Sequence, residues 1–148
     1  MERGGGRMLA LREIAPGGDA APAFAVREAV FVREQGVPPA HEWDDCDPIS
    51  FHVVLCRDGA PIACGRVYAE GSTAVLGRVA VLPAERRKGH ALQICRALID
   101  IAARLGAQRL TLHAQTHAAP LYEKLGFVRV GPEFLEEGIV HVRMDRRL

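Results

Sequence analysis

The stretch LPAERRKGHALQICRALI, residues 82–99, joins a strand-like apolar run to a helical pattern. Three consecutive cations stand at 86–88, and Gly89 separates them from the helix. The first N–H groups of a helix have no partner within it, and the helix dipole makes that end positive, so such a turn favours an anion. Gly89 has no side chain and lets a phosphate approach the backbone. The stretch therefore predicts a phosphate site, although a run of charge is also common as a solvated turn.

Outward from this turn, apolar periodicity predicts one mixed domain of strands and helices. Apolar or alternating runs predict strands at 8–15, 51–57, 60–69, 73–82, 109–114, 127–130 and 139–146. Helical patterns predict three helices: from Asp19 to about Gln35, from Gly89 to Gly106, and over 116–126. The expected buried face of the first helix contains Phe24, Val30 and Phe31. That of the second contains Ala91, Ile94, Cys95, Leu98, Ile101 and Ala102. Gly36 is placed to end the first helix, and 36–49 reads as a loop rich in proline and acids. The order is β-α-β-β-β-α-β-α-β-β, over 8–148, after a Gly/Arg-rich flexible tail at 1–7.

The bulk composition excludes several classes of protein. The chain has 148 residues, 49% of them hydrophobic, and 19 Lys and Arg against 18 Asp and Glu give a net charge of +1. A nucleic-acid-binding protein usually has a basic excess, and a membrane helix needs about 20 apolar residues in a row, so neither partner is expected. The start of the chain lacks a secretory signal. Four dispersed cysteines without a C-x-x-C pair favour reduced thiols in a cytoplasmic protein, with no metal site.

Three separated motifs then resemble one family. Arg86-x-x-Gly89-x-Ala91, after the strand end VAVLP, resembles the acyl-CoA pyrophosphate loop of the GNAT superfamily of N-acetyltransferases. PLYEKLGFVRVG, residues 120–131, resembles the last helix and strand of that family. VFVREQGVP at 30–38, with GPEFLEEGIVHVRM at 131–144, is similar to its YjcF/ElaA-like subgroup. The resemblance covers about residues 8–147 and implies a single α/β domain, of the α+β kind, whose mixed and mostly antiparallel central sheet is flanked by helices.

The resemblance also implies acetyl-CoA as co-substrate. The residues that match the pyrophosphate loop are Arg86, Arg87, Lys88, Gly89, His90 and Ala91. Arginine at 87 and histidine at 90 depart from the residues commoner in the family. Neither change alters the expected binding of phosphate by main-chain N–H groups. The strand before the loop, with Val79, Ala80 and Val81, would offer backbone groups to the pantetheine arm and splay from the strand that starts at 109. The valine side chains suit plain core packing as well.

The catalytic groups follow from the same resemblance. It implies direct attack by an amine on the thioester in a ternary complex, with no protein nucleophile; Cys95 is therefore interpreted as core. Tyr122 matches the family tyrosine that faces the CoA sulfur and protonates the thiolate, although an amphipathic core tyrosine would look the same. The general base stays open between a water relay and several side chains: Glu34, Glu42, Asp44, Asp45, His52 and His113. His113 is the candidate that lies on the splayed neighbouring strand, and histidine titrates near neutrality. An ordinary histidine that lines a strand would have the same pattern.

The sequence says least about the acceptor and the site that binds it. Glu34 and Gln35 belong to the subgroup signature and are expected to line its site, together with Trp43 and Asp44 of the acidic loop. Trp43 also suits a loop anchor, and Asp44, Asp45 and Asp47 suit either a solvated loop or attraction of a cationic amine. The expected acceptor is a small-molecule amine or a peptide amino group. Homodimers are common in the superfamily, and no segment here forces one.

Three other functions are weighed against this one. An acyl-CoA-binding sensor or regulatory domain without turnover would keep the pyrophosphate loop, and the intact Tyr122 motif argues against it. VFVREQG is also similar to acyl-homoserine-lactone synthases, which are longer and carry further motifs that are missing here. A P-loop hydrolase is excluded, because no G-x-x-x-x-G-K-[ST] occurs and Lys88 precedes its glycine.

Overall fold

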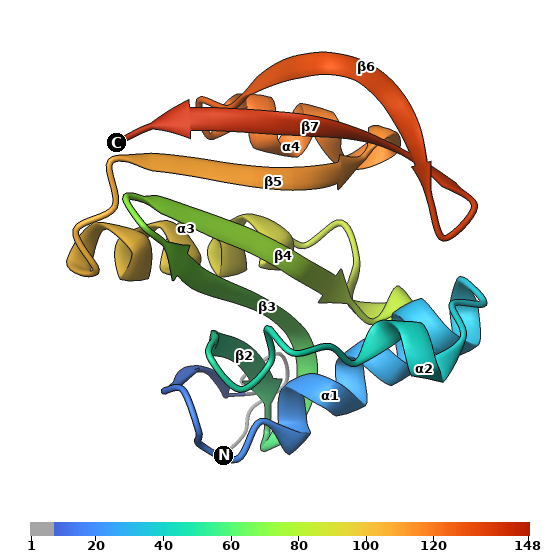
Figure 1. The fold of residues 1–148 in the computed structure, drawn as a ribbon. Helices are drawn as coiled ribbons and strands as arrows, with labels where there is room; N and C mark the ends of the chain where they lie inside the picture. Colours follow the sequence, from blue (N-terminus) through green and yellow to red (C-terminus); the bar gives the residue numbers. More distant parts are fainter. Residues whose placement is uncertain (1–7) are drawn as a thin grey trace.

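The computed structural model describes residues 8–148, which form one sheet covered by helices on both faces (Figure 1). The predicted tail at 1–7 lies outside the described residues. The strands are β1 (Leu9–Ile14), β2 (Phe51–Arg57), β3 (Ala60–Glu70), β4 (Thr73–Val81), β5 (Arg109–Gln115), β6 (Val128–Glu136) and β7 (Ile139–Arg147). The helices are α1 (Ala21–Arg27), the π-helix η1 (Glu28–Glu34), α2 (Pro39–Glu42), α3 (His90–Arg104) and α4 (Ala119–Lys124), with 3₁₀ turns η2 (Pro83–Glu85) and η3 (Thr116–Ala118). The predicted order and fold class are confirmed.

Three local features differ from the sequence prediction. The helix that starts after Asp19 widens at Glu28 into a π-helix, in which the N–H of Gln35 bonds the carbonyl of Val30. The acidic loop contains the single helical turn α2, which its two prolines start rather than prevent, since proline is tolerated in a first turn. The strand predicted at 127–130 continues to Glu136, because a register irregularity after Val130 lets β6 pass its glycine and proline and pair again with β7.

The sheet divides in its middle. Its strand order is β1-β2-β3-β4-β5-β7-β6, and every pairing is antiparallel except that of β4 with β5. These two strands pair only from Thr73–Val75 to Arg109–Thr111, and no further pair between them follows in residues 8–148. Beyond Val75 the two halves of the sheet diverge, as β4 and β5 do in Figure 1.

A bulge in β4 bends the strand away from β5. The register with β3 shifts between Cys64 and Arg66, so two residues of β4 stand opposite one residue of β3. One of them, Arg78, has a φ of 53°, a left-handed conformation that is uncommon for a residue with a side chain. The irregularity therefore lies at the point where β4 leaves its partner.

Alternation along β2 separates the two cores. Val53 and Leu55 join the cluster under α3 and α4, whereas Val54 and Cys56 join the cluster under α1 and η1. The long helix α3 buries one stripe of residues: His90, Ile94, Cys95, Leu98, Ile101 and Ala102. Packing on both faces makes the half of the sheet formed by β1 to β4 a rigid support for the opening.

The contact of α3 with β3 gives a stability prediction. A Cβ on Gly65 would lie 2.7 Å from Ile94 Cγ2 and 2.8 Å from Leu98 Cδ1, whereas a Cβ on Gly77 in β4 would meet nothing within 4 Å. We expect Gly65→Ala to lower the free energy of unfolding by about 1–3 kcal/mol through overpacking. Gly77→Ala, the matched control, should change it by less than about 0.5 kcal/mol. Urea titration measures both, and equal effects would contradict the close packing of α3.

Candidate active site

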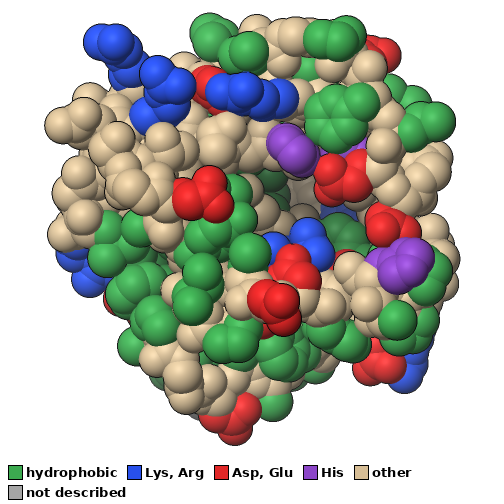
Figure 2. All heavy atoms as spheres, viewed as in Figure 1, with side chains coloured by type: hydrophobic (Ala, Val, Ile, Leu, Met, Phe, Trp, Pro, Cys, Tyr) green, Lys and Arg blue, Asp and Glu red, His purple; other side chains and the backbone are tan. Residues whose placement is uncertain are grey.

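A cavity of about 810 Å³ occupies the opening between β4 and β5. Figure 2 shows a hollow on this face with acidic and histidine side chains around it. Eleven of the candidate site residues from the sequence line the cavity: Glu34, Gln35, Glu42, Asp44, Val79, Ala80, Val81, Arg86, Ala91, His113 and Tyr122. They come from η1 and its end, the acidic loop, β4, residues 86–89 (the glycine turn), the start of α3, β5 and α4. The fold thus brings most of the predicted site together.

Five residues that were expected to bind the cofactor or the acceptor do not line this cavity. They are Trp43, Arg87, Lys88, Gly89 and His90. The Trp43 ring lies 5.1 Å from the Phe24 ring and 4.9 Å from the Arg27 guanidinium, which anchors the acidic loop on α1. The His90 side chain is buried, with Nε2 3.4 Å from Glu85.

The glycine turn has a left-handed residue at the start of α3. Gly89 is the N-cap of this 15-residue helix and has a φ of 83°, a conformation that favours glycine over most other residues. Glu85 stabilises the turn by ion pairs to Arg57 and Lys88 and by a contact with His90 Nε2. The hydrogen bond from Arg57 keeps the pKa of the Glu85 carboxyl at about 2. Lys88 and His90 are thus both fixed by Glu85, next to the first N–H groups of α3.

Arg86 connects the turn to η1. Its two terminal nitrogens lie 2.8 and 2.6 Å from the carboxylate oxygens of Glu34, and its Nε donates to the carbonyl of Val81. The hydrogen bond from Arg86 lowers the pKa of the Glu34 carboxyl, which disfavours Glu34 as a proton acceptor. Both residues line the cavity.

Tyr122 is 7% exposed and packs in the core between α3 and α4. Burial, followed by its hydrogen bond with the Cys95 thiol, raises the pKa of the Tyr122 hydroxyl well above its ordinary value. The hydroxyl carries its proton at neutral pH, as an ordinary tyrosine does, and the raised pKa makes it a weaker acid. Cys95 lies in the same core, as expected, and burial raises the pKa of its thiol to about 12.

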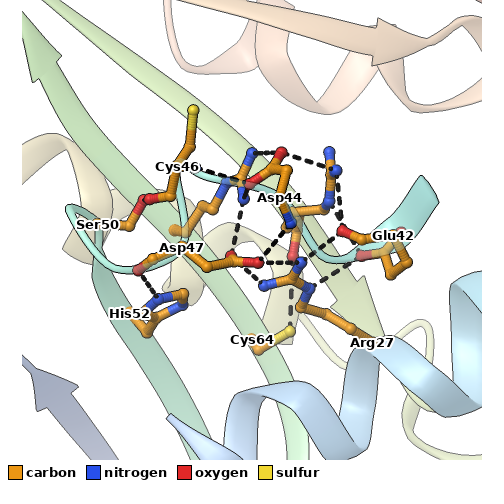
Figure 3. A network of polar contacts seen from close by, with 10 residues as sticks. Arg27, Glu42, Asp44, Cys46, Asp47, Ser50, His52 and Cys64 are labelled. Carbon is orange, nitrogen blue, oxygen red and sulfur yellow. Dashed lines mark hydrogen bonds and ion pairs between the residues drawn. The ribbon is translucent and has the colours of Figure 1, made fainter. Parts of the chain in front are cut away.

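Three arginines and three acids form a network of polar contacts beside the cavity (Figure 3), and four of them, Glu42, Asp44, Arg66 and Arg78, line it. Arg27, only 1% exposed, contacts Glu42 at 2.9 Å and Asp47 at 2.6 Å. Arg66 contacts Asp44 at 2.6 Å and Asp47 at 2.8 Å. Arg78, the bulge residue, contacts Glu42 at 3.0 Å and Asp44 at 3.2 Å. The three positive and three negative charges cancel, so Asp44 and Asp47, two of the three acids that the sequence offered for a cationic acceptor, are already paired.

The sequence reading did not single out these arginines. The available signal was an arginine within each of two apolar strands, ACGRVYA and LGRVAV, together with a loop of four acids that needs cations. Burial opposes ionisation of Asp47, but Arg27 and Arg66 outweigh it and hold the pKa of its carboxyl at about 2. Burial raises the pKa of the Glu42 carboxyl despite the nearby arginines.

The other candidates for the general base differ in whether they lie at the cavity. His52 is buried away from the cavity, its Nε2 3.1 Å from the carbonyl of Asp47, and burial lowers the pKa of its imidazole. Asp45 is exposed and does not line the cavity. His113 lines the cavity, and its Nδ1 lies 2.9 Å from Glu136 Oε1.

Two contacts cross the opening. The side-chain amides of Gln35 and Gln115 exchange hydrogen bonds of 2.9 and 3.4 Å. His41 of α2 lies 3.0 Å from Glu137 in the β6–β7 turn. These pairs join the two halves of the divided sheet above the cavity. In the described part of the chain, no group of three or more His, Cys, Asp or Glu side chains is arranged to hold a metal ion, and no helix is long and apolar enough to cross a membrane.

The parted strands, the glycine turn before α3 and Tyr122 thus meet around one cavity, as expected for an acyltransferase. The model of the acetyltransferase (GNAT) domain matches residues 28–148, and the chain belongs to this family. YjcF of Bacillus subtilis, an uncharacterised N-acetyltransferase, is 41% identical over 82% of this chain and 88% of its own length. This relative supports the YjcF/ElaA-like subgroup and the assignment of the chain as an acyltransferase.

Solved structures agree with this assignment. An acyl-CoA N-acyltransferase of Pseudomonas aeruginosa has a TM-score of 0.84 at 29% identity, over 94% of this chain and 99% of its own. ElaA of Escherichia coli has a TM-score of 0.85 at 23% identity, over 95% of this chain and 100% of its own, and so shares the fold.

The pKa of Asp47 gives a pH prediction. Because this pKa is about 2 in the folded protein and 3.8 ordinarily, the ionised carboxylate stabilises the fold fully above about pH 4 and loses that effect as the pH falls through 2. The contribution is about 2 kcal/mol. We expect Asp47→Asn to lower the free energy of unfolding at pH 7 by about 3 kcal/mol, since it leaves buried Arg27 short of a partner.

The same variant should lose about 2 kcal/mol less than the parent protein between pH 4 and pH 2. Asp45→Asn, an exposed neighbour, is the control and should follow the parent at every pH. Urea titrations across this range measure the free energy of unfolding. Parallel pH profiles for Asp47→Asn and the parent would contradict the buried network.

Proposed function

We propose that this protein transfers an acetyl group from acetyl-CoA to an amine by direct attack within a ternary complex. The observation that supports it most strongly is the parting of β4 from β5 after only three residue pairs, next to the glycine turn. A strand without a partner leaves backbone N–H and C=O groups that must find other polar groups. The amides of a pantetheine arm supply such groups.

Acetyl-CoA would lie along β4 with its pyrophosphate at the start of α3. The N–H groups of Gly89, His90 and Ala91 would bind the phosphate oxygens, and Arg86, Arg87 and Lys88 would add positive charge. Val79, Ala80 and Val81 would pair through their backbone with the pantetheine. This placement explains why Gly89 and Arg87 need not line the cavity, since the phosphates would lie at its outer end.

The two proton transfers of the reaction, from the amine and to the thiolate, would take place on opposite faces of β5. Leu112 and Ala114 belong to the core that contains Tyr122, so His113 between them lies on the opposite face of the sheet. The amine nitrogen would attack the thioester carbonyl from the face of His113, which accepts a proton from it. As the bond between carbon and sulfur breaks, Tyr122 would donate its proton to the thiolate leaving group.

The acceptor is proposed to be a small amine or the amino group of a flexible peptide. The pairs Gln35–Gln115 and His41–Glu137 cross the opening, which leaves a folded protein surface little room to reach the thioester. Glu34 and Gln35 would line its path. An acyl-CoA sensor without turnover remains the rival, and release of free CoA with a panel of small amines separates the two.

The pyrophosphate placement is tested at Gly89. We expect Gly89→Asp to weaken acetyl-CoA binding by at least about 100-fold, because a carboxylate would stand beside the phosphates. Gly89→Asn has the same shape and tolerates the left-handed conformation, so it should retain most of the affinity. Calorimetric titration with acetyl-CoA and desulfo-CoA measures both. If the two variants bind equally well, the phosphates do not lie at this turn.

The role of Tyr122 is tested by Tyr122→Phe, which removes the hydroxyl and keeps the ring. We expect kcat to fall about 10²–10⁴-fold, the usual contribution of a general acid, with calorimetric affinity for acetyl-CoA nearly unchanged. The assay follows free thiol release with the best amine of the panel. An unaltered kcat would remove Tyr122 as the proton donor and leave it a core residue.

A further inference from the structure

Glu136, the last residue of β6, forms a pair with His113 that the proposed chemistry has not yet used. Glu136 Oε1 lies 2.9 Å from His113 Nδ1, and both residues line the cavity. We infer that Glu136 is the positioning residue of the general base: it fixes the proton of His113 on Nδ1 and so leaves Nε2 free to accept the proton of the amine. This inference rests on the proposed function.

His113 lies at the point where β4 and β5 diverge, which is why its contact with Glu136 matters for the proposed reaction. Thr111 is the last residue of β5 that pairs with β4, and His113 is the next residue on the same face. It therefore stands where the two halves of the sheet part. A base at this point lies beside the line along which the pantetheine arm is proposed to run.

The imidazole is held from two sides. The Phe134 ring meets the His113 ring edge to face, with ring centres 4.9 Å apart, and is itself stacked on His141 at 6.0 Å. Phe134 and Glu136 are two residues apart on β6, so both extend from the same face of that strand. Since His141 Nδ1 lies 2.7 Å from the carbonyl of Ile139, this supporting ring is fixed in turn.

The chemistry of the pair determines which nitrogen is free. An ionised carboxylate only accepts hydrogen bonds, so the nitrogen that faces Glu136 must carry the hydrogen. The neutral imidazole then has its lone pair on Nε2. When Nε2 takes a proton, the adjacent negative charge stabilises the imidazolium, as in other catalytic pairs of a carboxylate and a histidine.

An exposed ion pair is the competing explanation. His113 is 52% exposed and Glu136 is 41% exposed, and such pairs contribute little to stability. The packing by Phe134 and the location at the fork distinguish this pair from an ordinary surface contact. The same exposure also makes the inference testable, because truncating Glu136 should not unfold the protein.

The test is Glu136→Ala, with Glu133→Ala as matched control. Glu133 is an exposed acid on the same strand that does not line the cavity. We expect Glu136→Ala to lower kcat about tenfold to hundredfold, with the calorimetric affinity for acetyl-CoA unchanged. Nitrogen NMR of labelled protein should show the proton of His113 on Nδ1 in the parent and a shift toward Nε2 in Glu136→Ala. His113→Asn assigns the signal.

The conservative variant adds a rescue. The amide oxygen of Glu136→Gln can still accept from Nδ1, so this variant should keep the parent tautomer and have a kcat between those of the parent and Glu136→Ala. An unchanged kcat or an unchanged His113 tautomer in folded Glu136→Ala overturns the inference, even if the parent enzyme turns over normally. A parent protein that binds acetyl-CoA but acetylates no amine overturns the proposed function and the base role together.

Discussion

The backbone hydrogen bonds that β4 and β5 do not make are the constraint on which the rest of the structure depends. Parallel strands in one sheet normally pair along their whole length, yet these two pair only over Thr73–Val75 and Arg109–Thr111. Unpaired peptide groups inside a domain are costly, so an opening of this kind persists only where another molecule satisfies them. The structure keeps β5 in place from its other side, since β5 pairs with β7 from Arg109 to Gln115. The strands therefore form one continuous sheet that is interrupted only between β4 and β5, beyond Val75 and Thr111.

The interruption is held open by charge. Arg78 adopts a left-handed backbone conformation at the bulge, and its guanidinium contacts Glu42 and Asp44 of the acidic loop. Those acids are fixed in turn by Arg27 and Arg66 from α1 and β3. A buried network of this kind contributes little net stability compared with apolar packing, but its partners are costly to remove, so it specifies one geometry. Strain at Arg78 is thus balanced by contacts that exist only when loop, helix and strands are in register.

Much of the fold followed from the sequence, because local periodicity determines it. The strands, the helix after Gly89 and its glycine cap depend on residues close together in the chain, and the resemblance of three motifs supplied the topology. The π-helix and the arginine network did not follow, because they depend on contacts between distant segments. Trp43 illustrates the limit: the sequence favoured an anchor of the loop over contact with the acceptor, and the partners of that anchor, Phe24 and Arg27, appear only in the folded structure.

The π-helix explains how the first helix reaches the site. Its wider hydrogen bonding, from Gln35 back to Val30, rotates the last residues relative to an α-helix and directs Glu34 and Gln35 to the cavity. From there Glu34 contacts Arg86 in the turn before α3 and Gln35 contacts Gln115 at the end of β5. One irregular segment therefore touches both the turn proposed to hold the phosphates and the strand proposed to carry the base. Because each contact is polar and partly exposed, each can exchange for a bond to a ligand at little cost.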